Sequence, residues 1–336
     1  CLLRILKHSD NVFSISSFSG TVATNFYMQM KKPDKSPAGE TPMLQPSCAP
    51  PDANPSKPRI TCPPGTCECH SHVFGPVARF PYGTMRSYTP PEAPLEKYLA
   101  LHDALGIDRG VLVQGSVYGT DNSAMLAALE YAPDRLRGVA VINREFTAAD
   151  LKGMSELGVR GARFNHFFRN GVPVFKGGVG IDDFLDVHDS LADLGWHLQL
   201  WIHCSDLPDV WPRLRHCRTP IVIDHMGRID AVKGLPYPGF DFLLRLLAEG
   251  RLWVKLSGIY RGTDNWPTYP EARPFHGALV AANPERCVWG LDWPHPALKA
   301  TMPNDGGLLD IFNDWTPDAD IRRRILVENP ALLYRF

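Results

Sequence analysis

Short apolar runs alternate with longer amphipathic stretches from residue 59 to the end of the chain. Apolar, β-branched runs of this length indicate buried strands, and apolar residues three and four positions apart indicate helices. The expected strands are 66–72, 109–114, 136–142, 159–165, 196–203, 220–225, 252–257 and 287–292. The expected helices are 95–105, 123–131, 148–157, 181–194, 208–216, 240–248, 271–282 and 318–326.

Eight strand-then-helix units in one chain favour one architecture. Parallel strands joined by right-handed crossovers through helices close into a TIM-like (β/α)8 barrel, which takes roughly 250 residues. A doubly wound open sheet is the alternative, and it is disfavoured because no GxGxxG motif follows the first expected strand. We therefore predict an α/β fold with a barrel over residues 59–336.

Residues 1–58 differ in composition from the rest of the chain. Eight prolines lie between positions 31 and 58, and proline cannot donate a backbone hydrogen bond to a helix or a sheet. We predict a disordered, Pro-rich extension. Residues 1–30 contain serine and few acidic residues, which is a weak indication of an organelle-targeting segment. The interpretation we favour is an over-extended reading frame, with the native start at Met28, Met30 or Met43.

Composition excludes several classes of partner. A net charge of -1 gives no basic footprint for nucleic acid or an anionic membrane, so a small molecule is the expected partner. No apolar run reaches the roughly 18 residues that a membrane-spanning helix needs. The eight cysteines form no paired CxxC framework, which favours reduced thiols and a cytoplasmic location. A monomer or homodimer is expected.

Polar side chains end most of the expected strands, and in a barrel these ends meet at one mouth. His70 and His72 end the first strand and, being two positions apart, lie on the same face. Trp201 and His203 have the same spacing on the fifth strand. Asp292 follows the last apolar run, inside Gly-Leu-Asp-Trp-Pro-His-Pro, where it is either a reactive carboxylate or the cap of the next turn.

Further polar residues belong to the same strand ends. Arginine is suited to bidentate recognition of a carboxylate, although a salt bridge to one of the barrel's own acids is an alternative for each arginine. These residues are Gln114, Ser116, Arg163, Arg169, His225, Arg228 and Arg261. Because burying so many polar and charged groups without partners is costly, their joint placement favours a concave site for an anionic molecule.

Several motifs in the barrel region resemble those of the amidohydrolase superfamily. They are CHSHVFGP (69–76), VQGSVYGTDN (113–122), RGARFN (160–165), IVIDHMGR (221–228), WGLDWPHP (289–296) and the closing ENPALLYRF (328–336). Within the superfamily, the chain is similar to the amidohydrolase-related (amidohydrolase 2) group that includes the 2-pyrone-4,6-dicarboxylate lactonases. This resemblance implies a distorted (β/α)8 barrel that opens a cyclic ester by hydrolysis during the breakdown of aromatic compounds.

The resemblance also implies roles for individual residues. Asp292 would act as the general base on water, and His225 would contact the scissile carbonyl region. His70 and His72 would serve as hydrogen-bond donors there. The residues implied to contact the substrate are Arg163, Arg169, Arg228, Arg261, Ser116, Gln114 and Trp201.

The chain departs from the lactonase pattern at two positions. His203 stands where the lactonases have an acidic residue, and Trp201 stands where they have a tyrosine. With His203, the set His70, His72, His203 and Asp292 matches the mononuclear metal site of zinc-dependent decarboxylases and hydrolases of the superfamily. Three histidines and a carboxylate suit Zn²⁺. The lactonase hypothesis requires no cofactor, and one zinc or another divalent metal is the alternative.

Three functions are compatible with these residues. The leading hypothesis is hydrolysis of a small carboxylated lactone, with Asp292 taking a proton from water. A second is a metal-dependent decarboxylase or a sugar-acid lactone hydrolase or isomerase of the same superfamily. A third is a ligand-binding barrel without catalytic activity.

Overall fold

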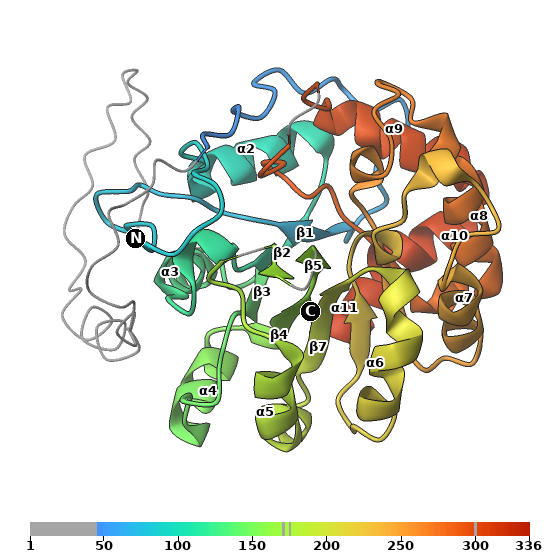
Figure 1. Cartoon of the computed structure of the whole chain (residues 1–336). Coiled ribbons are helices and arrows are strands. Elements are labelled where there is room, and N and C mark those ends of the chain that lie inside the picture. The colour runs from blue at the N-terminus through green and yellow to red at the C-terminus, as the bar shows by residue number, and fades with distance from the viewer. Residues whose placement is uncertain (1–45, 170–171, 175, 299–300) are drawn as a thin grey trace, which may run out of the picture.

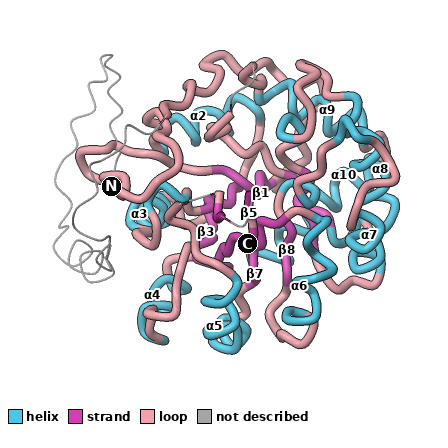
Figure 2. The backbone as a smooth tube through the Cα atoms, viewed as in Figure 1, coloured by secondary structure: helices cyan, strands magenta, loops and turns pink. Residues whose placement is uncertain are grey.

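Eight parallel strands form the centre of the protein and helices surround them, as Figure 2 shows in magenta and cyan. The computed structural model describes residues 46–169, 172–174, 176–298 and 301–336. The strands, in their order around the sheet, are β1 (Cys67–Ser71), β2 (Arg109–Val113), β3 (Leu136–Ala140), β4 (Val159–His166), β7 (His197–Ile202), β8 (Ile221–Ile223), β9 (Trp253–Leu256) and β10 (Cys287–Trp289). The TIM-like barrel predicted from the sequence is confirmed.

The barrel closes between its first and last strands. Beyond the end of β10, the Asp292 backbone N–H donates to the His70 carbonyl at 2.7 Å, and the His72 N–H donates to the Trp293 carbonyl at 2.7 Å. The buried carboxylate of Glu68 accepts the backbone N–H groups of His70 and Leu291, each at 2.8 Å. The seam is therefore made by the residues that follow β1 and β10, and the barrel is nearly closed.

Helices cover the outside of the barrel (Figure 1). They are α2 (Leu95–Leu105), α3 (Ser123–Tyr131), α4 (Ala148–Glu156), α5 (Ile181–Asp193), α6 (Leu207–Leu214), α7 (Phe240–Ala248), α8 (Arg273–Ala282), α9 (Asp305–Trp315), α10 (Ala319–Arg323) and α11 (Asn329–Tyr334). Tyr334 of α11 packs against valines and cysteines of the barrel strands, so the end of the chain closes the base of the barrel. In the view of Figure 1 that end lies over the centre of the ring.

Three features of the fold differ from the sequence prediction. Helix α9 was not expected. The expected helix 318–326 is instead α10 followed by a π-helical turn, Arg324–Glu328, and by α11. A small antiparallel hairpin, β5 (Phe168–Arg169) with β6 (Val172–Pro173), interrupts the connection after β4.

Part of the expected extension packs against the barrel. The backbone of Cys48 donates to the Thr89 carbonyl at 2.9 Å, and the Ser56 hydroxyl donates to Asn304 at 2.7 Å. Arg59 pairs with Asp310 and Asp314 of α9. These contacts hold residues 46–58 although they form no helix, and the domain boundary at residue 58 stays a prediction. The prediction for residues 1–45 lies outside the described residues.

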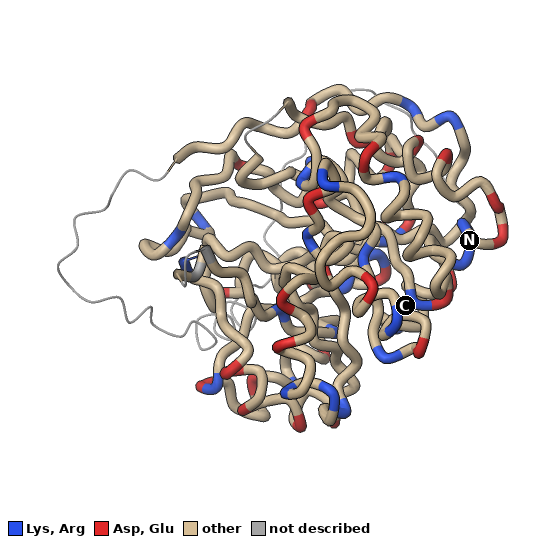
Figure 3. The backbone as a smooth tube through the Cα atoms, turned by 45° about the vertical axis from the view of Figure 1, so that its right-hand side comes forward, with Lys and Arg blue, Asp and Glu red and all other residues tan. Residues whose placement is uncertain are grey.

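Basic and acidic residues are interleaved along the described chain in Figure 3. None of the helices in the described ranges is long and apolar enough to cross a membrane. The seven cysteines between residues 46 and 336 are free thiols.

Candidate active site

Asp292 lies at the mouth of the barrel, three residues after β10 ends. Its side chain is only 1% exposed. Its backbone φ is 68°, a left-handed value that is uncommon for a residue with a side chain and often occurs at functional sites. The backbone hydrogen bond to His70 across the seam holds this conformation.

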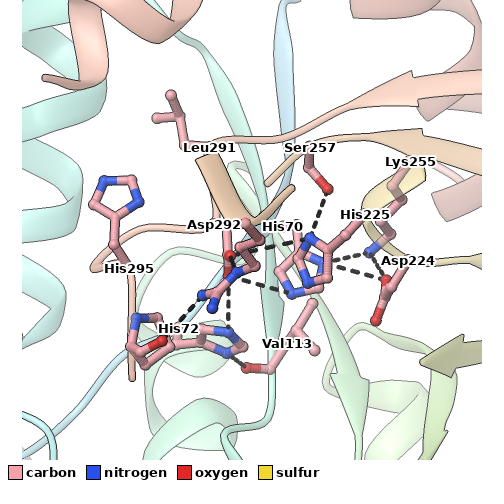
Figure 4. A network of polar contacts seen from close by, with 12 residues as sticks. His70, His72, Val113, Asp224, His225, Lys255, Ser257, Leu291, Asp292 and His295 are labelled. Atoms are coloured by element: carbon pink, nitrogen blue, oxygen red, sulfur yellow. Dashed lines mark hydrogen bonds and ion pairs between the residues drawn. The ribbon is translucent and has the colours of Figure 1, made fainter. Parts of the chain in front are cut away.

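The two carboxylate oxygens of Asp292 have different neighbours. Oδ2 accepts the Arg261 Nε–H at 2.6 Å and the Tyr260 hydroxyl at 2.8 Å. Oδ1 faces His72 Nε2 at 3.5 Å and His70 Nε2 at 3.8 Å, as Figure 4 shows. Burial opposes ionisation, but Arg261 and the neighbouring histidines hold the pKa of Asp292 well below its usual value. Asp292 is therefore a carboxylate with one oxygen occupied and the other turned toward the histidines.

His72 has a defined tautomer when it is neutral. Its Nδ1 lies 2.7 Å from the Val113 carbonyl oxygen. Because a carbonyl only accepts hydrogen bonds, Nδ1 carries the proton. The lone pair of Nε2 then points toward Asp292.

His70 lies between two aspartates. Its Nδ1 is 3.3 Å from Asp224 Oδ1, and its Nε2 faces Asp292. Between Glu68 and Ser71, the register of β1 shifts relative to β2, so that β1 has one extra residue there. This irregularity is a β-bulge, and it contains His70. Burial lowers the pKa of His70 to about 3, against the opposing effect of Asp224, so the ring is neutral.

Asp224 belongs to an ionic network inside the barrel. The Arg163 Nε is 3.2 Å from Asp224 Oδ2, and Gln199 donates to the same oxygen at 3.1 Å. The fully buried Lys255 donates to Gln199 Oε1 at 2.6 Å and to the Cys69 carbonyl at 2.8 Å. Burial opposes ionisation of Asp224, but His70, Arg163 and Lys255 hold its pKa well below the usual value. This ionic network lies deeper in the barrel than the mouth, and through Asp224 it holds the His70 ring in place.

His225 completes the group of histidines. Its Nδ1 lies 3.0 Å from the Ser257 hydroxyl and 4.0 Å from Asp292 Oδ2. The turn that begins at His225 has positive φ at four successive residues, ending at Arg228, and includes Gly227, where a Cβ would meet Cys204 at 2.9 Å. Burial lowers the pKa of His225 well below its usual value, so it is a neutral imidazole beside the carboxylate.

Arg228 is a cation with unmet hydrogen-bonding capacity. Its Nε and Nη1 are buried, and neither has a hydrogen-bond partner within the described part of the chain. Its guanidinium lies over the rings of Phe167 and Trp201, at 5.5 and 5.8 Å from their centroids. The centroids of these two rings are 5.2 Å apart, and the ring planes are almost parallel, with an interplanar angle of 5°. Burial, followed by repulsion from Arg261, lowers the pKa of Arg228 to about 10, so it remains charged at neutral pH.

The structure brings together most of the residues expected at the site. His70, His72, His225 and Arg261 surround Asp292 at the mouth. Arg163 and Arg261 each pair with a barrel aspartate, as the salt-bridge alternative expected. Trp201 stacks beneath Arg163, whose guanidinium is 5.1 Å from the ring centroid.

Three expected residues have other placements, and the side chain of a fourth is not described. Gln114 donates to the Asp121 carbonyl at 2.6 Å and so supports a loop. Ser116 is hydrogen-bonded to Tyr88. His203 stacks on Phe167 at 4.7 Å, and it does not join the histidines near Asp292. The side chain of Arg169 lies outside the described residues.

The sequence-based list omits residues that complete the site. Asp224, Lys255 and Ser257 stand at or near strand ends, but nothing in the sequence pattern shows that they support His70 and His225. Tyr260 stands directly before Arg261 and was overlooked as a ligand of the carboxylate. The signal for Lys255 was its place within an apolar run, since a lysine buried in a strand requires a partner.

The donor atoms near Asp292 fit a metal ion. His70 Nε2, His72 Nε2 and Asp292 Oδ1 lie within 4.8 Å of one another, and a second such group is formed by His70, Asp224 and His225. His70 Nε2 is buried and has no hydrogen-bond partner among the described residues. With the His72 lone pair, this gives two nitrogen donors and one carboxylate oxygen, which suit Zn²⁺.

Fold and site together define a class of protein. A (β/α)8 barrel with a buried carboxylate, neutral histidines and arginines at the carboxyl ends of its strands is a barrel enzyme for a small molecule. The chain belongs to the amidohydrolase family, whose model, described as Amidohydrolase, matches residues 67–336.

Three known proteins are similar over most of their length. The 2-pyrone-4,6-dicarboxylate hydrolase of Comamonas testosteroni is 38% identical over 291 residues, covering 84% of this chain and 94% of the relative. The 4-sulfomuconolactone hydrolase of Hydrogenophaga intermedia is 36% identical over 293 residues, with 87% and 95% coverage. A crystal structure of an Agrobacterium tumefaciens protein has a TM-score of 0.73 at 30% identity, with 83% and 98% coverage.

Proposed function

We propose that this protein hydrolyses a small carboxylated lactone, with Asp292 as the general base on water. One observation carries the proposal: Asp292 is an ionised, buried carboxylate whose Oδ2 is occupied while its Oδ1 faces histidines at the mouth. The two relatives named above act, by name, on 2-pyrone-4,6-dicarboxylate and on 4-sulfomuconolactone, which supports a ring that carries anionic groups.

The reaction assigns a task to each side of the site. Water attacks the ester carbonyl while Asp292 takes one of its protons, and the ring C–O bond then breaks as the leaving oxygen regains a proton. Neutral His225 stands close to Asp292, where its N–H can polarise the carbonyl. Because the pKa of Asp292 is held low, the carboxylate is fully ionised at neutral pH but is a modest base.

Arg228 is the residue best suited to hold the substrate's anionic group. Two of its buried N–H groups have no partner among the described residues, and a carboxylate or a sulfonate would satisfy them. The flat, parallel rings of Phe167 and Trp201 beneath it limit how the guanidinium can turn.

A metal ion is compatible with this proposal. We propose that any zinc would be held by His70, His72 and Asp292, where it would supply a Lewis acid for the lactone carbonyl. Elemental analysis, with activity measured before and after chelation, decides between this and a site that works without metal. His72→Asn should lower the zinc content if zinc binds there, whereas His203→Phe should leave it unchanged.

Turnover assays test the function. The purified protein should open 2-pyrone-4,6-dicarboxylate or a sulfonated muconolactone and release one acid equivalent per ring, whereas uncharged 2-pyrone should be a poor substrate. Binding of these lactones without turnover, with and without added zinc, would indicate a ligand-binding barrel. Release of CO2, or an isomerised lactone as product, would identify the decarboxylase or isomerase alternative.

A further inference from the structure

A chain of three hydrogen bonds leads away from Asp292 into the protein. The Tyr260 hydroxyl lies 2.8 Å from Asp292 Oδ2, and His295 Nδ1 lies 2.8 Å from the same hydroxyl. His295 Nε2 is 3.0 Å from Asp305 Oδ1. All four side chains are buried, with exposures of 3% or less. In Figure 4, His295 lies on the side of Asp292 away from His225 and Asp224.

The His295 ring joins Tyr260 to helix α9. Its Nδ1 faces the Tyr260 hydroxyl, which donates to Asp292, and its Nε2 faces Asp305 in the first turn of α9. Because both ring nitrogens have a partner, the ring is held at both ends, and it fixes the position of the Tyr260 hydroxyl relative to α9.

The chain of hydrogen bonds ends inside the protein. Asp305 is 0% exposed, and its Oδ2 has no hydrogen-bond partner within the described ranges. A proton that entered the chain at Asp292 would have no outlet at Asp305. The arrangement is therefore suited to holding a group in place and not to conducting protons.

Asp292 needs such support. Its φ of 68° is matched by a φ of 58° at His295, and the His295 backbone N–H donates to the Asp292 carbonyl at 2.7 Å. A side chain on a turn of this kind could present either carboxylate oxygen to the histidines. With Oδ2 bound by Tyr260 and Arg261, only Oδ1 faces His70 and His72.

We propose that Asp305, His295 and Tyr260 are positioning residues for the proposed lactonase reaction, and that the His295 ring anchors Tyr260 to α9. Through Tyr260 they orient Asp292 so that Oδ1 receives the proton of water. The inference rests on the proposed function, because orientation is measured by turnover of a lactone.

A double-mutant cycle tests whether His295 acts through the Tyr260 hydroxyl. His295→Phe should lower kcat by about tenfold to a hundredfold, because a misplaced base loses its near-attack geometry. KM should stay within about twofold, since substrate binding is not touched. In the Tyr260→Phe background the same substitution should have no further effect on kcat. Equal losses in both backgrounds would overturn the proposal, because they would show that His295 only fills space.

Two further variants separate positioning from packing. Asp305→Asn can still hydrogen-bond to His295 and should retain most of kcat, whereas Asp305→Leu should lose as much as His295→Phe. His276→Phe is the matched control: His276 is also buried, and it is hydrogen-bonded to Thr316 at 2.8 Å, outside the chain. Its substitution should leave kcat unchanged. A kcat in Asp305→Asn as low as in Asp305→Leu would contradict the proposal.

An NMR measurement tests whether the hydrogen-bond chain exists, and it needs no activity assay. In protein labelled with ¹⁵N-histidine, the Nδ1 signal of His295 should shift when Tyr260 is replaced by Phe, because the hydrogen bond between them is lost, and an unchanged signal would overturn the assignment. If the wild-type protein hydrolyses no lactone, the proposed function fails, while this measurement still tests the chain. The NMR measurement also remains possible if the His295→Phe variant does not fold.

Discussion

Two buried aspartates face the same histidine from opposite sides. Asp224, at the end of β8, lies 3.3 Å from His70 Nδ1, and Asp292, after β10, lies 3.8 Å from His70 Nε2. Each pairs with an arginine, Arg163 at 3.2 Å and Arg261 at 2.6 Å. In both cases the neighbouring charges hold the pKa well below the usual value.

The two aspartates differ in their neighbours and in backbone conformation. Asp224 has an ordinary extended backbone with φ -72°, and the fully buried Lys255 lies 3.8 Å from its carboxylate. Asp292 has φ 68°, and its Oδ1 faces His70 and His72. A buried carboxylate surrounded by fixed cations stabilises the barrel. A carboxylate with one oxygen directed at the mouth is available for chemistry, and His70 links the two.

The largest expected effect comes from removing the charge at the mouth. Asp292→Asn should lower kcat by about 10²- to 10⁴-fold, the range for loss of a general base. The fold should survive, because an amide oxygen can still accept from Arg261 and Tyr260. Steady-state kinetics and a thermal melt measure both results. Asp314→Asn, on the exposed face of α9, is the control that should change neither greatly. Unchanged kcat in Asp292→Asn would remove the role assigned to this residue.

An asparagine substitution at the other aspartate, Asp224, should lower the stability of the fold. Asp224→Asn leaves Lys255 and Arg163 without a counter-ion and should lower the free energy of unfolding by about 3–5 kcal/mol. Urea unfolding measures this change. Adding Lys255→Met to Asp224→Asn should restore part of the loss, because the unpaired buried cation is removed. A loss below about 1 kcal/mol, the scale of an exposed ion pair, would contradict the comparison.

Arg228 sharpens the comparison because, unlike Arg163 and Arg261, it is not paired with either aspartate. Arg228→Met should raise KM for a dicarboxylated lactone by an amount equivalent to about 1.5–3 kcal/mol, the value of a hydrogen bond to a charged group. Arg228→Lys keeps the charge but loses the fork geometry and should give a smaller increase. If both variants have the parent KM, the substrate's anion is held elsewhere.

The smallest expected effect is on the pH dependence of folding stability, and it comes from a buried histidine of α2. His102 of α2 is buried, and burial lowers its pKa to about 3. The unfolded chain binds a proton at His102 near pH 6.5 and the folded chain does not, so stability is lost as pH falls from 6.5 toward 3. The slope for one proton is about 1.4 kcal/mol per pH unit. His102→Leu should reduce the slope by this amount in urea unfolding at several pH values, and an unchanged slope would refute it.

The sequence predicts the barrel well because each strand is a short apolar run and most helices have an apolar face. Helix α9 is missed because Gly306 and Gly307 stand in its first turn and weaken the helical pattern. Residues 46–58 show a different limit. Their prolines correctly exclude helices, but a segment without regular structure can still pack, as Arg59 next to it does with α9.

The site was predicted as a set of residues and not as a set of contacts. Strand ends identified Asp292, His70, His72 and His225, because a parallel barrel must gather these ends. Pairing depends on distances across the barrel, which no local pattern contains. The pattern therefore did not show that Arg163 belongs to Asp224 and Arg261 to Asp292, or that His203 turns toward Phe167.

The seam of the barrel has a consequence for synthesis of the protein on the ribosome. Glu68 is bonded to the Leu291 backbone, 223 positions later in the sequence, and the site takes His70 from one side of this seam and Asp292 from the other. A nascent chain that has not yet reached β10 has two unpaired strand edges and no base, so it is inactive and prone to pair with other strands. Activity should therefore appear all at once, when β10 and Asp292 have left the ribosome.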